Sequence, residues 1–189
     1  MALTRLGPNN SSSISGINLT SQVTGTLPTG NGGTGATSFA PGKLKQVVTS
    51  VLAANTYSSS SSAATVLTLS FTPTSASTQV AVFCNVNTQL YGNNTATNFG
   101  GYLTIRKEIG GSGSDITKEY FDQNSFGNSN TSYISIPVNL NGVFTPGATT
   151  QCDIYLRYQT NGAGRIGIFG NDDAAFDNPT RLIAMEYST

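Results

Sequence analysis

Apolar and polar residues alternate along several short stretches of the chain after residue 64. In TVLTLSF, the side chains of Leu67, Leu69 and Phe71 fall on one face, and YISIPVNL and CDIYLRY alternate in the same way from Ile134 and from Cys152. Successive side chains of a β-strand point to opposite faces, so this period of two is typical of antiparallel strands with one buried face.

The alternation and the polar segments between the apolar stretches predict nine strands. We expect them near residues 44–53, 65–72, 78–89, 101–109, 116–122, 132–141, 150–160, 164–169 and 180–188. No stretch keeps a helical period for three turns. So many short strands predict an all-β chain, an antiparallel β-sandwich that is jelly-roll-like. An immunoglobulin-like sandwich is the alternative, although the chain has no tryptophan. Pro137 predicts an edge strand or a bulge.

Residues 1–42 differ from the rest of the chain. Glycine, proline, asparagine, serine and threonine dominate this segment, and its only charge is Arg5. Such a segment cannot bury enough apolar surface to offset the entropy of ordering it. We therefore expect an extended arm at residues 1–42 and a sandwich head at residues 43–189. Loops rich in glycine, asparagine and serine are expected between the strands, at YGNNTATNFGG, GGSGSD, DQNSFGNSN, TNGAG and GNDDAAFDNP.

The chain carries few charges, and they balance. Lysine plus arginine number 9 and aspartate plus glutamate number 9, which together make 10 % of the residues. This composition suits a protein packed into an assembly, and it lacks the clustered cations that nucleic-acid binding needs. No apolar run is long enough to cross a bilayer, and the first residues lack the apolar core of a secretory signal. We expect a protein made in the cytoplasm that inserts into no membrane.

The residues that enzymes use most are scarce. The chain has no histidine, which removes the commonest general base and the usual zinc ligand. Asp172, Asp173 and Asp177 form a weak candidate calcium site, because carboxylates on a loop are hard oxygen ligands, but an ordinary turn explains them as well. The prediction is a protein with no enzymatic activity, no cofactor and no metal.

The two cysteines fall on the apolar phase of predicted strands. Cys84 lies in VAVFCNVN and Cys152 in QCDIYLRY. We expect two buried core residues. A disulfide across the sandwich is the open alternative, because sequence alone does not pair cysteines.

Aromatic residues and asparagines gather in or beside the predicted loops. Such loops make adaptable contact surfaces, and their rings suit stacking on sugars. The alternative is that the aromatics cap the core or fill a subunit interface. The candidate receptor-contact residues are Tyr91, Asn93, Asn94, Phe99, Asn124, Phe126 and Asn128.

The segment TGTLPTGNGGTGATS carries a resemblance to a known group. Gly-Thr-Leu-Pro followed by Asn-Gly-Gly-Thr-Gly resembles a segment of small tail-fibre and other virion proteins of tailed bacteriophages, of marine and cyanobacterial type. The opening MALTRLG and the stretch INLTSQVTGTL look like the same N-terminal region. In the head, VLTLSFTPTSASTQVAVFCNVN and the ending NPTRLIAMEYST, with Leu182, Met185 and Glu186, are similar to the sandwich domain of that group.

The resemblance implies a homotrimeric tail-fibre protein of the virion. Residues 1–42 would attach it to other virion proteins of the tail or capsid, and the exposed head would contact a host cell-surface glycan. Two alternatives remain open: a trimeric capsid decoration (cement or head-fibre) protein and a free carbohydrate-binding module. The candidate attachment residues are Arg5, Leu6, Ile17, Leu19, Leu27, Pro28, Gly30, Gly32, Gly33 and Gly35.

Overall fold

The computed structural model of the chain describes residues 43–91, 98–124, 133–161, 164–170 and 179–188. All of the regular structure in these ranges is β-strand. The strands are β1 (Leu44–Val51), β2 (Thr56–Ser58), β3 (Ala64–Phe71), β4 (Gln79–Tyr91), β5 (Asn98–Ile109), β6 (Ser112–Asn124), β7 (Tyr133–Phe144), β8 (Cys152–Asn161), β9 (Arg165–Ile168) and β10 (Arg181–Tyr187). The arm expected at residues 1–42 lies outside the described residues, so its conformation stays a prediction.

The nine predicted strands are all present, and the short strand β2 is an addition. Several strands reach further than the alternation indicated. The segment GGSGSD is not a loop: Gly110 and Gly111 alone make the turn, and β6 begins at Ser112. Both turn glycines have positive φ, 58° and 79°, which is the conformation that a tight two-residue hairpin requires and that other residues rarely adopt.

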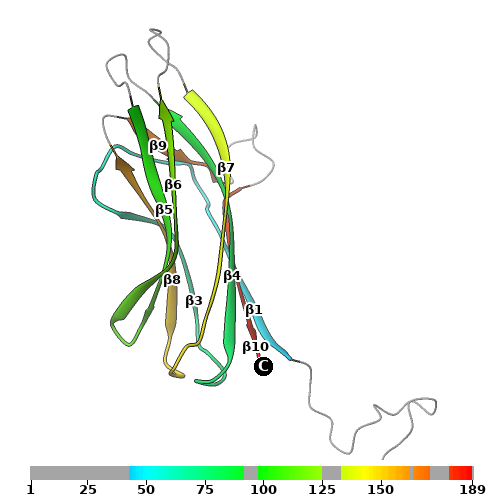
Figure 1. Cartoon of the computed structure of the whole chain (residues 1–189). Coiled ribbons are helices and arrows are strands. Elements are labelled where there is room, and N and C mark those ends of the chain that lie inside the picture. Colours follow the sequence, from blue (N-terminus) through cyan, green and yellow to red (C-terminus); the bar gives the residue numbers. More distant parts are fainter. Residues whose placement is uncertain (1–42, 92–97, 125–132, 162–163, 171–178, 189) are drawn as a thin grey trace, which may run out of the picture. The chain divides into compact units, whose positions relative to one another are not determined.

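The strands pair as one long hairpin that has been rolled up. The hairpin turns between β5 and β6, and the further pairs are β4 with β7, β3 with β8, and β1 with β10. Rolling joins β10 to β4 and β8 to β5, which gives one sheet in the order β3-β8-β5-β6 and another built on β1-β10-β4-β7. Figure 1 shows the two sheets packed against each other. This pairing confirms the predicted jelly-roll sandwich.

We call the sheet that contains β4 sheet A and the sheet that contains β8 sheet B. The short strands continue two of the long strands of sheet A. Strands β9 and β10 pair one after the other with β4, and β2 pairs with β9 as β1 pairs with β10. Strand β7 pairs with β4 alone among the described strands, so Pro137 lies in an edge strand, as predicted.

The core lies between the sheets and takes its side chains from alternate positions of both. From sheet A, β4 contributes Val80, Val82 and Val86, and from sheet B, β8 contributes Ile154 and Leu156. The opposite positions of each strand form the two outer faces. The period of two seen in the sequence therefore becomes one shared apolar interior and two separate outer surfaces.

One carboxylate lies inside the sandwich. Glu186 of β10 is only 1 % exposed. Its Oε1 accepts hydrogen bonds from the backbone N–H and hydroxyl of Thr74 at 2.8 and 2.9 Å and from the hydroxyl of Thr78 at 2.6 Å, and its Oε2 accepts from Gln46 Nε2 at 2.5 Å. Burial raises the pKa of Glu186, but the hydrogen bonds from Thr78, Gln46 and Thr74 outweigh burial and hold this pKa below its ordinary value.

Candidate functional site

Five strand ends meet at one end of the sandwich. The end of β4 pairs with the start of β7 (Tyr91 with Tyr133) and of β9 (Tyr91 with Arg165), and the start of β5 pairs with the end of β6. Figure 1 shows these ends at the top. Of the candidate receptor-contact residues, Tyr91, Phe99 and Asn124 belong to β4, β5 and β6 rather than to loops. The others, Asn93, Asn94, Phe126 and Asn128, lie outside the described residues.

A cluster of two tyrosines and an arginine lies on the outer face of sheet A near this end. The Arg165 guanidinium lies 4.8 Å from the ring centre of Tyr57 and 4.6 Å from that of Tyr91. The two tyrosine rings meet edge to face, with their centres 5.8 Å apart. Tyr57 is 43 % exposed, so a ring braced by a cation faces the solvent.

Gly167 makes room for this cluster. A Cβ at this position would lie 2.8 Å from the ring of Tyr57 and 3.1 Å from that of Tyr91, which is too close for both rings to stay in place. The tyrosine rings therefore rest on the bare backbone of β9. The hydroxyl of Tyr91 also donates to Gln89 Oε1, and Gln89 Nε2 donates to the Ser135 hydroxyl at 3.0 Å, which fixes the ring from the other side.

Below the cluster, the outer face of sheet A is hollowed into a groove. Its volume is about 530 Å³. Side chains that face each other across three strands line it: Phe83 of β4 lies between Ile183 and Asn141, and Asn85 lies between Arg181 and Asn139. Asn87, Pro137 and Pro179 complete the wall. We call this hollow the asparagine groove.

The polar groups of the asparagine groove have hydrogen-bonding capacity that the described protein does not use. In the described part of the chain, the side chains of Asn85, Asn139, Asn141 and Arg181 have no hydrogen-bond or ion-pair partner. Each amide offers two donors and an acceptor, and the guanidinium offers donors only. Beside them, Phe83 is 46 % exposed.

The asparagine groove was missed in the sequence, although a signal is present. The stretches FCNVN and VNLNG each place two asparagines two residues apart, on the polar phase of a predicted strand. Two such pairs on separate strands could meet only if the strands were neighbours in the right register. That register, Asn85 with Asn139, comes from the fold.

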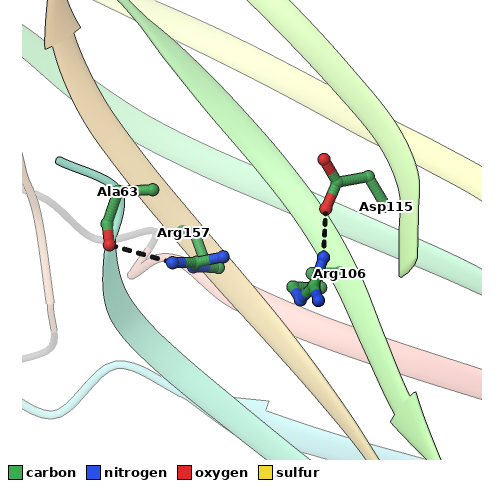
Figure 2. A network of polar contacts seen from close by, with 4 residues as sticks. All are labelled: Ala63, Arg106, Asp115 and Arg157. Carbon is green, nitrogen blue, oxygen red and sulfur yellow. Dashed lines mark hydrogen bonds and ion pairs between the residues drawn. The ribbon is translucent and has the colours of Figure 1, made fainter. Parts of the chain in front are cut away.

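The outer face of sheet B is built differently, because its polar groups largely satisfy one another. Arg106 and Asp115 form an ion pair at 3.1 Å, and a guanidinium nitrogen of Arg157 donates to the carbonyl of Ala63 at 2.9 Å (Figure 2). The Nε of Arg157 is buried without a partner in the described residues. The ammonium of Lys118 lies 3.9 Å from the ring centre of Tyr102.

The other predicted sites stay predictions. Asp172, Asp173 and Asp177 lie outside the described residues, as do all the candidate attachment residues of the arm. Within the described ranges, no three histidine, cysteine, aspartate or glutamate side chains gather as metal ligands do. None of the described segments is a helix long and apolar enough to span a membrane.

The two cysteines are buried and free, as core residues rather than a disulfide. Cys84 projects inward from β4 of sheet A, and Cys152 from β8 of sheet B. Burial raises the pKa of the Cys84 thiol to about 12. Burial also raises the pKa of Cys152, to about 11, against the opposing charge of Lys107. At neutral pH both groups are thiols with little nucleophilic character.

Comparison with known proteins yields structural likenesses alone. No protein-family model matches the sequence, and no curated protein matches it. Three similar structures are of infectious bursal disease virus. The VP2 subviral particle has 16 % sequence identity and a TM-score of 0.34, over 76 % of this chain and 38 % of that chain. The T13 viral particle has 17 % identity and a TM-score of 0.34, over 87 % of this chain and 40 % of that chain, and the Gt strain has 14 % identity and a TM-score of 0.33, over 87 % of this chain and 43 % of that chain.

This chain thus spans about two fifths of the length of those viral chains. TM-scores this low do not say what the chain does.

Proposed function

We propose that this chain is a non-enzymatic structural protein of a bacteriophage virion, of the trimeric tail-fibre type. Residues 1–42 attach it to other virion proteins, and the sandwich is an exposed head that contacts the host surface. The observation that carries the proposal is the jelly-roll pairing of the head, an architecture that viral capsid proteins and lectins share. The sequence of the arm supports the same assignment through its resemblance to tail-fibre proteins.

The composition of the head supports a binding role rather than catalysis. The described residues that line the asparagine groove are amides, an arginine and apolar side chains, with no carboxylate among them. A pair of carboxyl groups is what most glycoside hydrolases need. A low and balanced charge also suits a protein that works in close contact with other subunits.

Sedimentation of the purified full-length chain tests the trimer. We expect the purified chain to sediment as a complex of three copies at micromolar concentration. A stable monomer over the same range of concentrations contradicts the trimer.

Quantitative mass spectrometry of purified particles tests the virion assignment and separates a fibre from a decoration protein. A tail fibre should be present in at most a few tens of copies, whereas a capsid decoration protein repeats over the shell on the order of hundreds of times. Absence of the chain from particles overturns both. A free carbohydrate-binding module would also be absent.

Replacement of Gly32 and Gly33 by valine tests the arm. We expect a folded head, with an unchanged unfolding temperature, and poor incorporation into particles, because β-branched residues do not follow a backbone path that glycine permits. The control is Thr68→Val, a change of similar size at an exposed position of β3, which should leave both the head and its incorporation unchanged. Normal incorporation of the valine variant would make the glycine run only a spacer.

A further inference from the structure

We propose that the asparagine groove binds an oligosaccharide chain, held by the amides and stacked on Phe83. The location of the binding site is argued from the groove alone. That the glycan comes from a host cell surface rests on the proposed function.

The groove offers the chemistry that a hydroxyl-rich ligand needs. Hydroxyl groups both donate and accept hydrogen bonds, and so do the amides of Asn85, Asn139 and Asn141. These three amides have no partner in the described protein. Asn85 and Asn139 lie directly opposite each other on β4 and β7, so their amides can engage neighbouring hydroxyls of one sugar unit. Arg181, opposite Asn85 on β10, adds donors on the other side.

Apolar surface suited to sugar rings lies at both ends of this polar stretch. Phe83 is exposed at one end of the groove, and Tyr57 is exposed at the far end of the same face, braced by Arg165. Along β4 the outer positions between them run through Asn85, Asn87 and Gln89. From position 83 to position 91 a strand extends about 27 Å, which leaves room for several sugar units in line.

Two other occupants fit the groove less well. An extended peptide that adds a strand could pair only with the outer edge of β7, because β4 in the middle of the groove is paired with β7 on one side and with β10 and β9 on the other. A strand added at that edge would extend the sheet and would leave the amides on its outer face unused. A second copy of the chain would remove the amides of three asparagines and the Arg181 guanidinium from water. Each buried polar group without a partner is destabilising, so a dry protein contact would need a matching polar group for every one.

We assign the groove to binding rather than to cleavage. The residues that line it include no carboxylate in the described part of the chain. Hydrolysis of a glycosidic bond ordinarily needs a general acid and a second carboxylate on either side of the bond. A bound oligosaccharide should therefore leave the groove intact.

The test is binding of the full-length chain to an array of bacterial O-polysaccharides, capsular polysaccharides and peptidoglycan fragments, with maltohexaose and chitohexaose as neutral probes. Titration calorimetry then measures the affinity for the strongest probe. We expect Phe83→Ala and the double variant N85A/N139A each to weaken this affinity about tenfold or more, because stacking and paired hydrogen bonds are lost. The matched control is Tyr120→Ala on sheet B, whose ring is 48 % exposed against 46 % for Phe83, and which should change the affinity less than about twofold.

Four results would overturn the groove as the site. They are no binding to any probe, unchanged binding by both groove variants, loss of binding by Tyr120→Ala, or a change of oligomeric state caused by Phe83→Ala, which would make this face a contact between copies. Binding to the neutral hexasaccharides alone, lost in the groove variants, supports the groove and removes the host-surface source. If the chain binds through the groove but is absent from particles, the proposed function fails and the site remains.

Discussion

The outer faces of the two sheets share a fold and a core but differ in chemistry. On sheet B, opposite charges and tyrosines lie against one another, as in the Arg106–Asp115 ion pair and the contact of Lys118 with Tyr102. On sheet A, the outer face carries Asn85, Asn139 and Asn141, whose amides have no partner among the described residues, and no acidic residue of the described chain lies on it. The one described acid of that sheet, Glu186, points inward.

This difference separates a face whose polar groups are largely paired within the protein from a face that is open to a partner. Side chains that already hold one another have little to gain from a ligand, whereas solvated amides keep their donors and acceptors available. The inner faces show no such contrast, because both contribute close-packed apolar residues to one core. We therefore choose the outer face of sheet A as the proposed binding face because it has unused hydrogen-bonding groups. Exposure alone would not distinguish it from the outer face of sheet B.

The largest change in stability is expected on replacing the buried acid of sheet A, in comparison with an exposed acid of sheet B. Glu186→Ala should lower the free energy of unfolding by about 2 kcal/mol, because the buried Thr78 hydroxyl and the part-buried donors of Thr74 and Gln46 lose their carboxylate acceptor. Glu119→Ala, at an exposed position of β6, should stay within about 0.5 kcal/mol. Urea unfolding of the two variants measures both. Equal losses would show that Glu186 has no special role.

The pH dependence of stability should follow the same acid. The folded state holds the pKa of Glu186 below its ordinary value of 4.5, so the unfolded chain binds this proton first. The stabilisation is complete above about pH 4.5 and falls as the pH drops through the lower folded pKa. Unfolding followed from pH 6 to pH 2 should show a shallower acid limb for Glu186→Gln than for the wild type.

A control for this pH effect comes from sheet B. Hydrogen bonds from Ser70 and Gln151 lower the pKa of Asp153, which lies at the surface. Asp153→Asn should remove less of the acid limb than Glu186→Gln. The reverse order would contradict the contrast between the two carboxylates.

A smaller effect is expected for the ion pair on sheet B. Arg106 and Asp115 are 30 % and 49 % exposed, so water screens their attraction. A double-mutant cycle with Arg106→Ala and Asp115→Ala should give a coupling of about 0.5 kcal/mol that falls in high salt. A coupling above about 2 kcal/mol would show that the pair anchors sheet B rather than merely satisfying its surface.

The smallest difference is expected between the two thiols, because the inner faces are alike. Cys84 and Cys152 are buried, with the pKa of each raised by burial, to about 12 and about 11. In the folded protein at pH 8, both should react with a water-soluble disulfide reagent at least on the order of 100-fold more slowly than in urea. Mass spectrometry of single Cys→Ser variants assigns the rates. Rapid labelling of one thiol alone would show that one sheet opens locally.

The strands follow from patterns that act over a few residues, and their number narrows the choice of architecture. The alternation around Leu69 and Ile154 requires strands with one buried face, and nine such strands leave few architectures. Strand β2 was not predicted, because TYS is too short to alternate. The strand ends at Asn98 and Asn124 were also not predicted, because pairing with a neighbour, and not local preference, makes those polar residues part of a strand.

The candidate site was harder to predict, because it depends on register. The asparagines of FCNVN and VNLNG are visible in the sequence, yet only the pairing of β4 with β7 brings Asn85 opposite Asn139. Likewise, Tyr57 and Arg165 meet only because β2 pairs with β9. Contacts between residues so distant in sequence are set by the whole fold.

The decisive measurement is a cryo-electron microscopy map of the purified phage particle. We predict three copies about a common axis, held to the particle through residues 1–42, with the heads outward and the asparagine groove open to solvent. Particles that lack the chain would contradict the virion assignment. Heads that bury their sheet A faces against one another would contradict the claim that this is the face open to a glycan.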